Sequence, residues 1–176
     1  AGRSVLFPAF SESLSADMSA RTGQVFGEAG YSLAFPGVEV EPFAGLAYVD
    51  VHLGSFTEAG GLAALTSAGT DAGVTYSTLG ARFSVPLTLG AMSADIRGLL
   101  GWQHAFGDTT PQMSFAFASG SPAFSVAGVP IASDAALVEA GLDLNLSANA
   151  GLSVFYAGQL ASSQTTNMVK GTFSLR

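Results

Sequence analysis

The sequence contains no cysteine among its 176 residues, which excludes disulfide bonds, thiolate metal sites and cysteine nucleophiles. Charged residues are also scarce: they make up 11% of the chain, whereas a soluble domain usually has roughly 25%. No stretch approaches the roughly 18 consecutive apolar residues of a membrane-spanning helix. A basic start followed by an apolar core is missing from Ala1 to Phe10, so we expect any export signal to lie upstream of this chain.

Basic residues are few as well, with six lysines and arginines against 13 aspartates and glutamates, and the formal net charge is −7. Nucleic acids are bound by clustered cations, so this balance argues against a nucleic acid as a partner. It also argues against a helix adsorbed on an anionic membrane surface.

Apolar residues, in contrast, are abundant at 48%, and they alternate with small or polar ones. Between 136 and 146 the even positions are all apolar, whereas most odd positions are polar or small, including Glu139 and Asp143. Segments 92–106 and 169–175 show the same period of two. An amphipathic helix would repeat its apolar residues at spacings of three and four, so the pattern predicts β-strands.

The alternation predicts an all-β, antiparallel up-and-down fold, and without a linker we expect residues 1–176 to form a single domain. Phe35-Pro36-Gly37 predicts a tight turn, because proline presets φ and glycine accepts a positive φ. Longer connections are expected at about 53–73 and about 120–132. We expect about nine strands, at roughly 10–20, 23–34, 38–52, 74–85, 91–106, 111–119, 133–147, 151–162 and 167–176.

Such strands would carry two kinds of side chain on opposite faces, as in a soluble sandwich or a membrane barrel, and alternation alone leaves both open. Expected lengths of about ten to sixteen residues exceed the roughly 5–6 of soluble sheets and suit a tilted bilayer crossing. In a barrel, the lumen-facing polar residues would be Glu28, Glu41, Arg82, Asp95, Arg97, Glu139 and Asp143. The lipid-facing or girdle aromatics would be Tyr31, Tyr48, Phe83, Trp102, Tyr156 and Phe173.

Six short segments follow one another along nearly the whole chain: GQVFGEAGY (Gly23 to Tyr31), PFAGLAYV (Pro42 to Val49), STLGARFS (Ser77 to Ser84), GWQHAFGD (Gly101 to Asp108), VPIASDAALVEAGLDL (Val129 to Leu144) and VKGTFSLR (Val169 to Arg176). Together, in this order, they resemble the autotransporter β-domain, the translocator barrel of type V secretion. Each segment alone is a weak signal, because it consists of small residues and aromatics in alternation, so the order of all six carries the resemblance.

The resemblance implies a twelve-stranded transmembrane barrel in a Gram-negative outer membrane, incomplete at its N-terminus here, with this chain as the fourth to twelfth strands. It implies that the barrel anchors an N-terminal passenger domain and helps export it to the cell surface. The implied partners are outer-membrane lipid, the protein's own upstream passenger and linker, and the barrel-assembly machinery.

Two positions depart from the family pattern. The family usually has arginine at the position of Gln103, and the neutral glutamine would remove one lumenal charge contact. It usually ends on an aromatic residue, whereas this chain ends at Arg176, which the alternation assigns to the lumenal face. A following lipid-facing aromatic would continue the register. If the C-terminus lies in the periplasm and the nine strands cross the membrane in alternating directions, the 53–73 connection falls on the periplasmic side.

Candidate chemistry is sparse. His52 has Asp50 nearby, but no GxSxG elbow supports a Ser-His-Asp site, so a solvated loop residue is the better interpretation. His104 falls on the lipid-facing parity near a strand end, as expected of an interfacial girdle. Glu139 and Asp143 are four residues apart on one strand, about 13 Å, which is too far for a carboxylate dyad. The sequence therefore predicts no catalysis, no cofactor and no metal site.

Two other functions stay open. A self-standing porin-like or adhesion barrel would have an even number of strands and would pair its first strand with its last. A soluble β-rich binding protein would be monodisperse in buffer without detergent.

Overall fold

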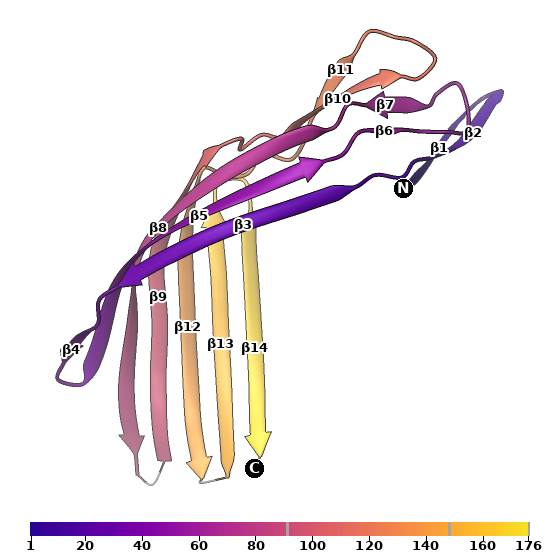
Figure 1. Cartoon of the computed structure of the whole chain (residues 1–176). Coiled ribbons are helices and arrows are strands. Elements are labelled where there is room, and N and C mark those ends of the chain that lie inside the picture. Colours follow the sequence, from indigo (N-terminus) through magenta and orange to yellow (C-terminus); the bar gives the residue numbers. More distant parts are fainter. Residues whose placement is uncertain (91, 148, 176) are drawn as a thin grey trace. The chain divides into compact units, whose positions relative to one another are not determined.

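The computed structural model describes residues 1–90, 92–147 and 149–175, and its regular structure consists of strands (Figure 1). Within these residues there is no helix long and apolar enough to span a membrane. The long strands are β3 (Ala20–Gly30), β5 (Val38–Leu53), β8 (Thr70–Leu89), β9 (Met92–Gly107), β12 (Asp134–Ser147), β13 (Ala150–Ala161) and β14 (Thr165–Leu175). The short ones are β1 (Gly2–Phe7), β2 (Phe10–Ser15), β4 (Leu33–Phe35), β6 (Phe56–Thr57), β7 (Leu65–Ser67), β10 (Gln112–Phe117) and β11 (Phe124–Ala127).

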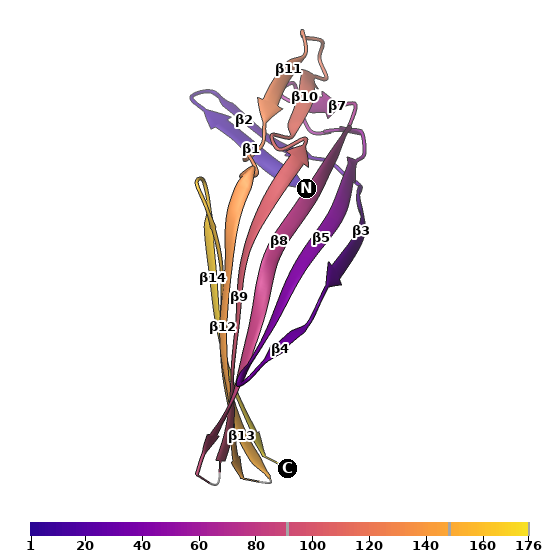
Figure 2. The same cartoon turned by 90° about the vertical axis from the view of Figure 1, so that its left-hand side faces the viewer.

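The long strands form one sheet in the order β14-β13-β12-β9-β8-β5-β3, with β4 added by its pairing to β5. β12 pairs antiparallel with both β9 and β13, and β13 pairs antiparallel with β14. Figure 2 shows these strands from the side. The long strands have 11 to 20 residues, which is enough to cross a bilayer at a tilt. The predicted all-β antiparallel architecture is confirmed.

The two end strands of this sheet, β14 and β3, are not paired with one another in the described part of the chain. The self-standing barrel predicted such first-to-last pairing, so this sheet lacks the closed topology of that alternative.

Two of the expected strands belong to smaller sheets instead. The segment 10–20 contains β2, which pairs with β1 in a hairpin whose register runs from Gly2↔Ser15 to Phe7↔Phe10. The segment 111–119 contains β10, which lies in a sheet of order β11-β10-β7-β6. A half-exposed hairpin alternates just as a barrel strand does, so the period of two does not distinguish them.

The connections differ in length, and short ones occur at both ends of the long strands, because residues 162–164 join β13 to β14 at the end where the long connections lie. The short ones include the predicted turn between β4 and β5, where Phe35 pairs with Val38 and Gly37 has φ 80°. The long ones are residues 54–69 and 108–133. The expectation of a periplasmic 53–73 connection is wrong, because β10 is not a strand of the main sheet and the count shifts by one. On the same premise of a periplasmic C-terminus, the corrected count would put both long connections on the outer side.

The chain divides into two compact units. Unit 1 comprises Ala1–Val25, Tyr48–Val74 and Gly107–Ile131, and unit 2 comprises Phe26–Ala47, Thr75–Phe106 and Ala132–Arg176. In unit 2 large apolar side chains such as Leu100 (58% exposed) and Val169 (73% exposed) lie on the surface. A soluble monomer rarely exposes a large contiguous apolar surface, so these side chains indicate contact with lipid or with another protein. The buried apolar side chains of unit 2 are few and mostly small: Phe43, Ala94, Leu99, Ala105 and Ala135.

Candidate functional site

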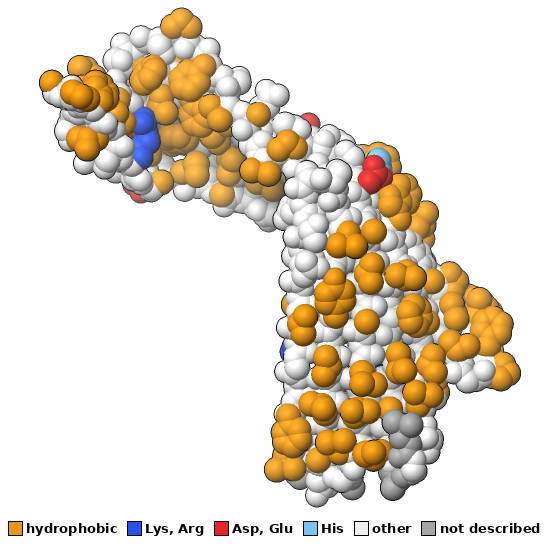
Figure 3. Space-filling view, turned by 180° about the vertical axis from the view of Figure 1, so that it is seen from behind, with side chains coloured by type: hydrophobic (Ala, Val, Ile, Leu, Met, Phe, Trp, Pro, Cys, Tyr) orange, Lys and Arg blue, Asp and Glu red, His pale blue; other side chains and the backbone are white. Residues whose placement is uncertain are grey.

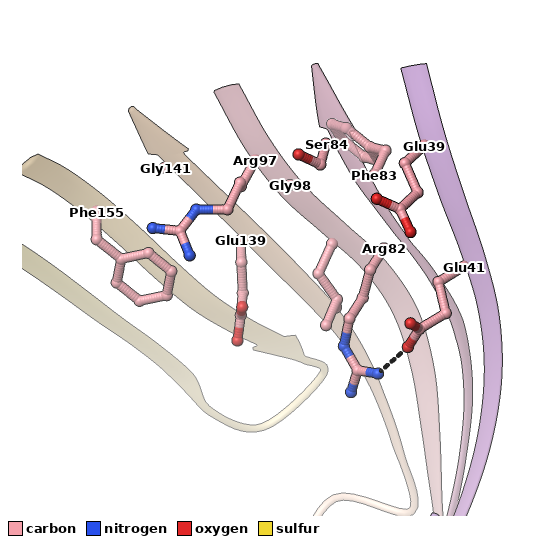
Figure 4. Close-up of a pocket in the computed structure, with 11 residues that line it drawn as sticks. Glu39, Glu41, Arg82, Phe83, Ser84, Arg97, Gly98, Glu139, Gly141 and Phe155 are labelled. Carbon is pink, nitrogen blue, oxygen red and sulfur yellow. Dashed lines mark hydrogen bonds and ion pairs between the residues drawn. The ribbon is translucent and has the colours of Figure 1, made fainter. Parts of the chain in front are cut away.

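One face of the main sheet in unit 2 carries ion pairs between neighbouring strands, and we call it the charged face (Figure 4). Arg82 of β8 lies between two carboxylates: its Nη1 is 2.8 Å from Oε1 of Glu28 on β3 and 2.9 Å from Oε1 of Glu41 on β5. Its guanidinium also lies 4.0 Å from the ring centroid of Phe43. One arginine thus connects three adjacent strands, through two charge-assisted contacts and a cation–π contact.

A second ion pair on this face joins the next strands of the sheet. Arg97 of β9 pairs with Asp143 of β12, and the Ser153 hydroxyl of β13 donates to Oδ1 of Asp143 at 2.6 Å. Asp95 lies directly opposite Asp143 in the β9–β12 register. The sequence led us to expect lumenal acids either paired with arginines or hydrated, and here Asp143 has both an arginine and a hydroxyl as partners.

The remaining predicted polar residue, Glu139, borders a hollow of about 340 Å³ on the charged face. Glu41, Arg82 and Arg97 line the same hollow, and Figure 4 shows their side chains on adjacent strands. The two acids that β12 carries on the charged face are therefore in different surroundings: Asp143 is in an ion pair, and Glu139 is at the hollow.

Gln103, where the resemblance leads one to expect arginine, joins a chain of neutral hydrogen bonds. Its Nε2 donates to the Thr78 hydroxyl at 3.4 Å, and its Oε1 accepts from Nε2 of Gln159 at 3.2 Å. The amide bridges side chains of β8 and β13 without needing a counter-ion. The lumenal position predicted for Arg176 lies outside the described residues.

The alternate residues of the same strands project from the opposite face, which we call the aromatic face. Of the six predicted aromatics, Tyr31 (71%), Tyr48 (44%), Trp102 (47%) and Phe173 (64%) are exposed. Phe83 and Tyr156 are half-buried: a side chain at Gly98 would overlap the Phe83 ring, and the Tyr156 hydroxyl donates to Oδ1 of Asn167 at 2.8 Å. Phe83 also borders the hollow of the charged face. Figure 3 shows a surface of the molecule on which hydrophobic side chains far outnumber charged ones.

Near the end of β9, Trp102, His104 and Phe106 form an aromatic row. The His104 ring centroid lies 5.6 Å from that of Trp102 and 4.3 Å from that of Phe106. Asp134, the first residue of β12, accepts a hydrogen bond from Nε1 of Trp102 at 3.0 Å and lies 2.8 Å from Nδ1 of His104. Aromatic side chains with one polar tip commonly occupy membrane–water interfaces.

Comparison with known proteins decides what kind of sheet this is. The family model of the autotransporter β-domain matches residues 1–157. The chain belongs to the autotransporter β-domain family. The six ordered segments predicted this membership, and the prediction is confirmed. Autotransporter β-domains are translocator barrels of the bacterial outer membrane, which is the setting that an open apolar face requires.

Two curated relatives, both named extracellular serine protease of Serratia marcescens, are 38% and 36% identical to this β-domain chain over 174 residues. The alignments cover 99% of the chain but 17% of each relative. The chain therefore spans about a sixth of the length of these relatives. The protease activity that their names give belongs to those proteins.

The other histidine of this β-domain, His52, makes a different contact from the one its neighbours in sequence suggested. Its Nδ1 lies 2.5 Å from Oδ1 of Asp71 on β8, whereas Asp50 accepts a hydrogen bond from the Tyr48 hydroxyl at 3.4 Å. The side chains of His52 and Asp71 are 55% and 74% exposed. His52 is solvent-exposed, but it lies within β5, where it forms a cross-strand pair, and is not the loop residue that the sequence led us to expect.

Sequence analysis missed an ion pair in unit 1. Arg3 of β1 donates from Nε to Oε1 of Glu58 at 2.8 Å and from Nη2 to Oε2 at 2.7 Å. The same Nη2 donates to the carbonyl of Ala63, and the N–H of Leu65 donates to Glu58. The hydrogen bonds from Arg3 lower the pKa of the Glu58 carboxyl, and partial burial opposes them.

A second carboxylate holds the same hairpin to the same connection. Glu12 of β2 accepts from the backbone N–H groups of Leu62 and Ala63, each at 2.9 Å. We call these contacts of Glu12 and the Arg3–Glu58 pair the hairpin latch. Its partners are about fifty residues apart, so no local spacing predicts it. The opposite charges of Arg3 and Glu58 were the one available signal.

Proposed function

We propose that this chain forms part of the wall of an outer-membrane translocator barrel that anchors an N-terminal passenger and helps export it to the cell surface. The charged face lines the aqueous lumen, and the aromatic face contacts lipid. The observation that carries the proposal is the opposition of these two faces on one sheet of bilayer-length strands. Membership of the translocator family supports it.

The lumenal assignment rests on the cost of charge in lipid. A lysine or arginine facing lipid at the bilayer midplane costs about 2–4 kcal/mol. Arg97 is 63% exposed, and Glu28 and Glu41 are 43% and 35% exposed, so these groups need water as well as each other. The predicted acids Asp95 and Glu139 share the parity of Arg97 and Asp143, and a wet lumen also accommodates them.

The lipid assignment rests on what the alternate positions carry. Leu100, Trp102, Val154 and Phe173 are each more than 40% exposed, and they project opposite to the arginines. Their burial in acyl chains contributes roughly 25 cal/mol per Å² of apolar surface removed from water. Tyrosine and tryptophan on this face suit the headgroup level.

The open edges of β3 and β14 indicate how the barrel is completed. An unpaired strand edge in hydrocarbon leaves N–H and C=O groups without partners, at several kcal/mol each. We infer that further strands of the complete protein pair with both edges, so that residues 1–176 belong to one barrel domain. Insertion of such a barrel would require the barrel-assembly machinery as a partner.

In this proposal the chain has no catalytic role and holds no cofactor. Its charged groups act on each other: Arg82 engages two carboxylates, and Arg97 engages a third. The net charge of −7 is unsuited to nucleic acid. Export would depend on the upstream passenger and its linker passing along the lumenal, charged face.

A matched pair of substitutions tests the two faces in the complete protein. Val154 on the aromatic face and Thr172 on the charged face lie at nearly the same depth, because Ser153 pairs with Thr172. Val154→Arg should cost about 2–4 kcal/mol of barrel stability and reduce passenger display at the cell surface. Thr172→Arg should leave both nearly unchanged. Urea unfolding in vesicles and protease accessibility of the passenger on cells measure the two effects.

Equal losses in the two variants would refute the face assignment. Normal assembly without passenger display in wild-type protein would refute the export function.

A further inference from the structure

A shallow hollow lies on the aromatic face at the ends of β9, β12 and β13, where the 108–133 connection joins β9 to β12. The register places Trp102, Ala136 and Leu160 in one row across the three strands. The small alanine lies between two larger side chains, so the surface dips at Ala136. These residues border a hollow of about 630 Å³, whose rim includes Asp134 and the hydroxyl-bearing Ser162.

Asp134, on the polar rim of this hollow, is held by two side chains of β9. Oδ1 of Asp134 accepts from Nε1 of Trp102 and contacts Nδ1 of His104, at 3.0 and 2.8 Å. Two cross-strand contacts thus fix the carboxylate, although its side chain is 60% exposed. Its second oxygen, Oδ2, makes no hydrogen bond within the described part of the chain, so a hydroxyl in the hollow can donate to it.

The lining matches a sugar better than a fatty chain or a phosphate. Sugar hydroxyls both donate and accept hydrogen bonds, which suits a fixed carboxylate beside Ser162. The C–H groups of a sugar ring form apolar patches that can pack on Trp102 and Leu160. An acyl chain would leave the Asp134 carboxylate unsatisfied, and a phosphate would be repelled by it.

We propose that this hollow binds the sugar headgroup of an outer-leaflet glycolipid. The inference rests on the proposed function, because it requires the aromatic face to contact lipid. The location fits: the hollow lies at the strand ends that adjoin the long connections, on the outer side, where headgroups of the outer leaflet lie. Asp134 positions the headgroup, and the Trp102 ring borders the site at the level of the interface.

Lipid retention by the complete protein tests the inference. The protein is reconstituted in phosphatidylcholine nanodiscs containing a minor fraction of diglucosyl diacylglycerol, and retained lipids are counted by native mass spectrometry. Wild-type protein should retain glycolipid above its share of the bilayer. Ala136→Leu, which fills the hollow, and Asp134→Asn, which removes the charge, should each lower that retention about fivefold.

The matched control is Ala140→Leu, the same change at an exposed position of the same strand face, beyond the lining of the hollow. It should retain glycolipid as wild type does. Equal retention by wild type and Ala136→Leu, or no preference in wild type, would overturn the inference.

A second measurement separates this inference from the proposed function on which it rests. The Trp102 fluorescence, taken as the difference between wild type and Trp102→Phe, should be quenched by phosphatidylcholine brominated on its acyl chains. Quenching without glycolipid preference would overturn the headgroup site alone. Absence of quenching would overturn both, because Trp102 would then not face lipid.

Discussion

At the scale of single residues, aromatic rings of one strand fill the space above glycines of another. The Phe83 ring covers Gly98 on the aromatic face, and Phe43 covers Gly80 on the charged face. Glycine in a strand weakens it unless something packs over the bare backbone. These ring–glycine pairs restore that packing, and aromatic cover of glycines is a known device for stabilising sheets.

Replacement of Gly98 by alanine tests one such pair. The new Cβ would overlap the Phe83 ring, so Gly98→Ala should destabilise the folded barrel by about 1–3 kcal/mol. The Phe83→Leu background should remove part of that cost, because a smaller side chain can move aside. Urea unfolding of the four proteins of this cycle measures the coupling.

Gly171 is the matched control, because a Cβ built there meets no atom within 4 Å. Gly171→Ala should change stability little. A cost at Gly171 equal to that at Gly98 would show that backbone freedom, and not the ring, sets the effect.

For the candidate site, the sequence predicted on which face each residue lies but not which partner it contacts. Alternation and charge assigned Arg82 and Arg97 to the polar parity, and an arginine on a strand face needs a carboxylate nearby. Which carboxylate it finds depends on strand order and register, which alternation does not encode. Arg82 reaches Glu28 because β3 lies two strands away from β8 in the sheet. This position is known from the strand order of the structure and cannot be seen in the sequence pattern.

At the scale of elements, the hairpin of β1 and β2 is fastened to the 58–65 segment by the hairpin latch. Arg3 and Glu58 form a two-point pair whose glutamate is 11% exposed, which makes it stronger than an ordinary surface pair. Glu12 accepts two backbone N–H groups of the same connection. The latch contributes to the compactness of unit 1. The sequence pattern had indicated one long strand at 10–20 and gave no sign of this hairpin and its contacts.

The latch predicts a dependence of this hairpin on pH. Arg3 lowers the pKa of Glu58 in the folded protein, so the stabilisation is complete above the ordinary glutamate pKa of about 4.3. This stabilisation is lost as the pH falls through the lowered pKa of Glu58, because the protonated carboxyl has no charge with which to attract Arg3. Spin labels at the exposed Leu6 and Leu62 should report a narrow distance distribution at neutral pH and a broad one in acid.

Glu58→Gln should broaden that distribution already at neutral pH, since the amide cannot replace the charged pair. Glu139→Gln, on the other unit, serves as the control and should follow wild type. A width that does not change with pH in the wild type would contradict the role given to Glu58.

The sequence predicted the bounds of the long strands better than it predicted the pairing of the short ones. Strands β9, β12 and β13 lie close to their expected ranges, because each alternates over a dozen residues and ends at small or polar residues. The prediction for 111–119 had the right conformation but the wrong partner: β10 pairs with β7 and β11. Pairing between short strands depends on contacts that are distant in sequence, and local pattern carries little information on them.

At the scale of the whole molecule, the family and the sheet topology support each other. Six ordered segments predicted an autotransporter β-domain, and the family model matches residues 1–157. In the proposed barrel, β3 and β14, which are not paired with one another within the described residues, would pair with further strands, and the apolar face would contact lipid. The two long connections lie at the same end of the long strands, and long loops on one side are typical of outer-membrane barrels.

Cysteine labelling along β12 tests whether one face of the sheet meets the aqueous lumen and the other meets lipid. The chain has no cysteine of its own, so single cysteines can be placed from 138 to 145 in the complete protein, freed of other cysteines. In intact outer membranes, a hydrophilic maleimide should label the odd positions, which share the parity of Asp143, and leave the even ones unlabelled. Uniform labelling, or labelling of the even positions alone, would contradict the account.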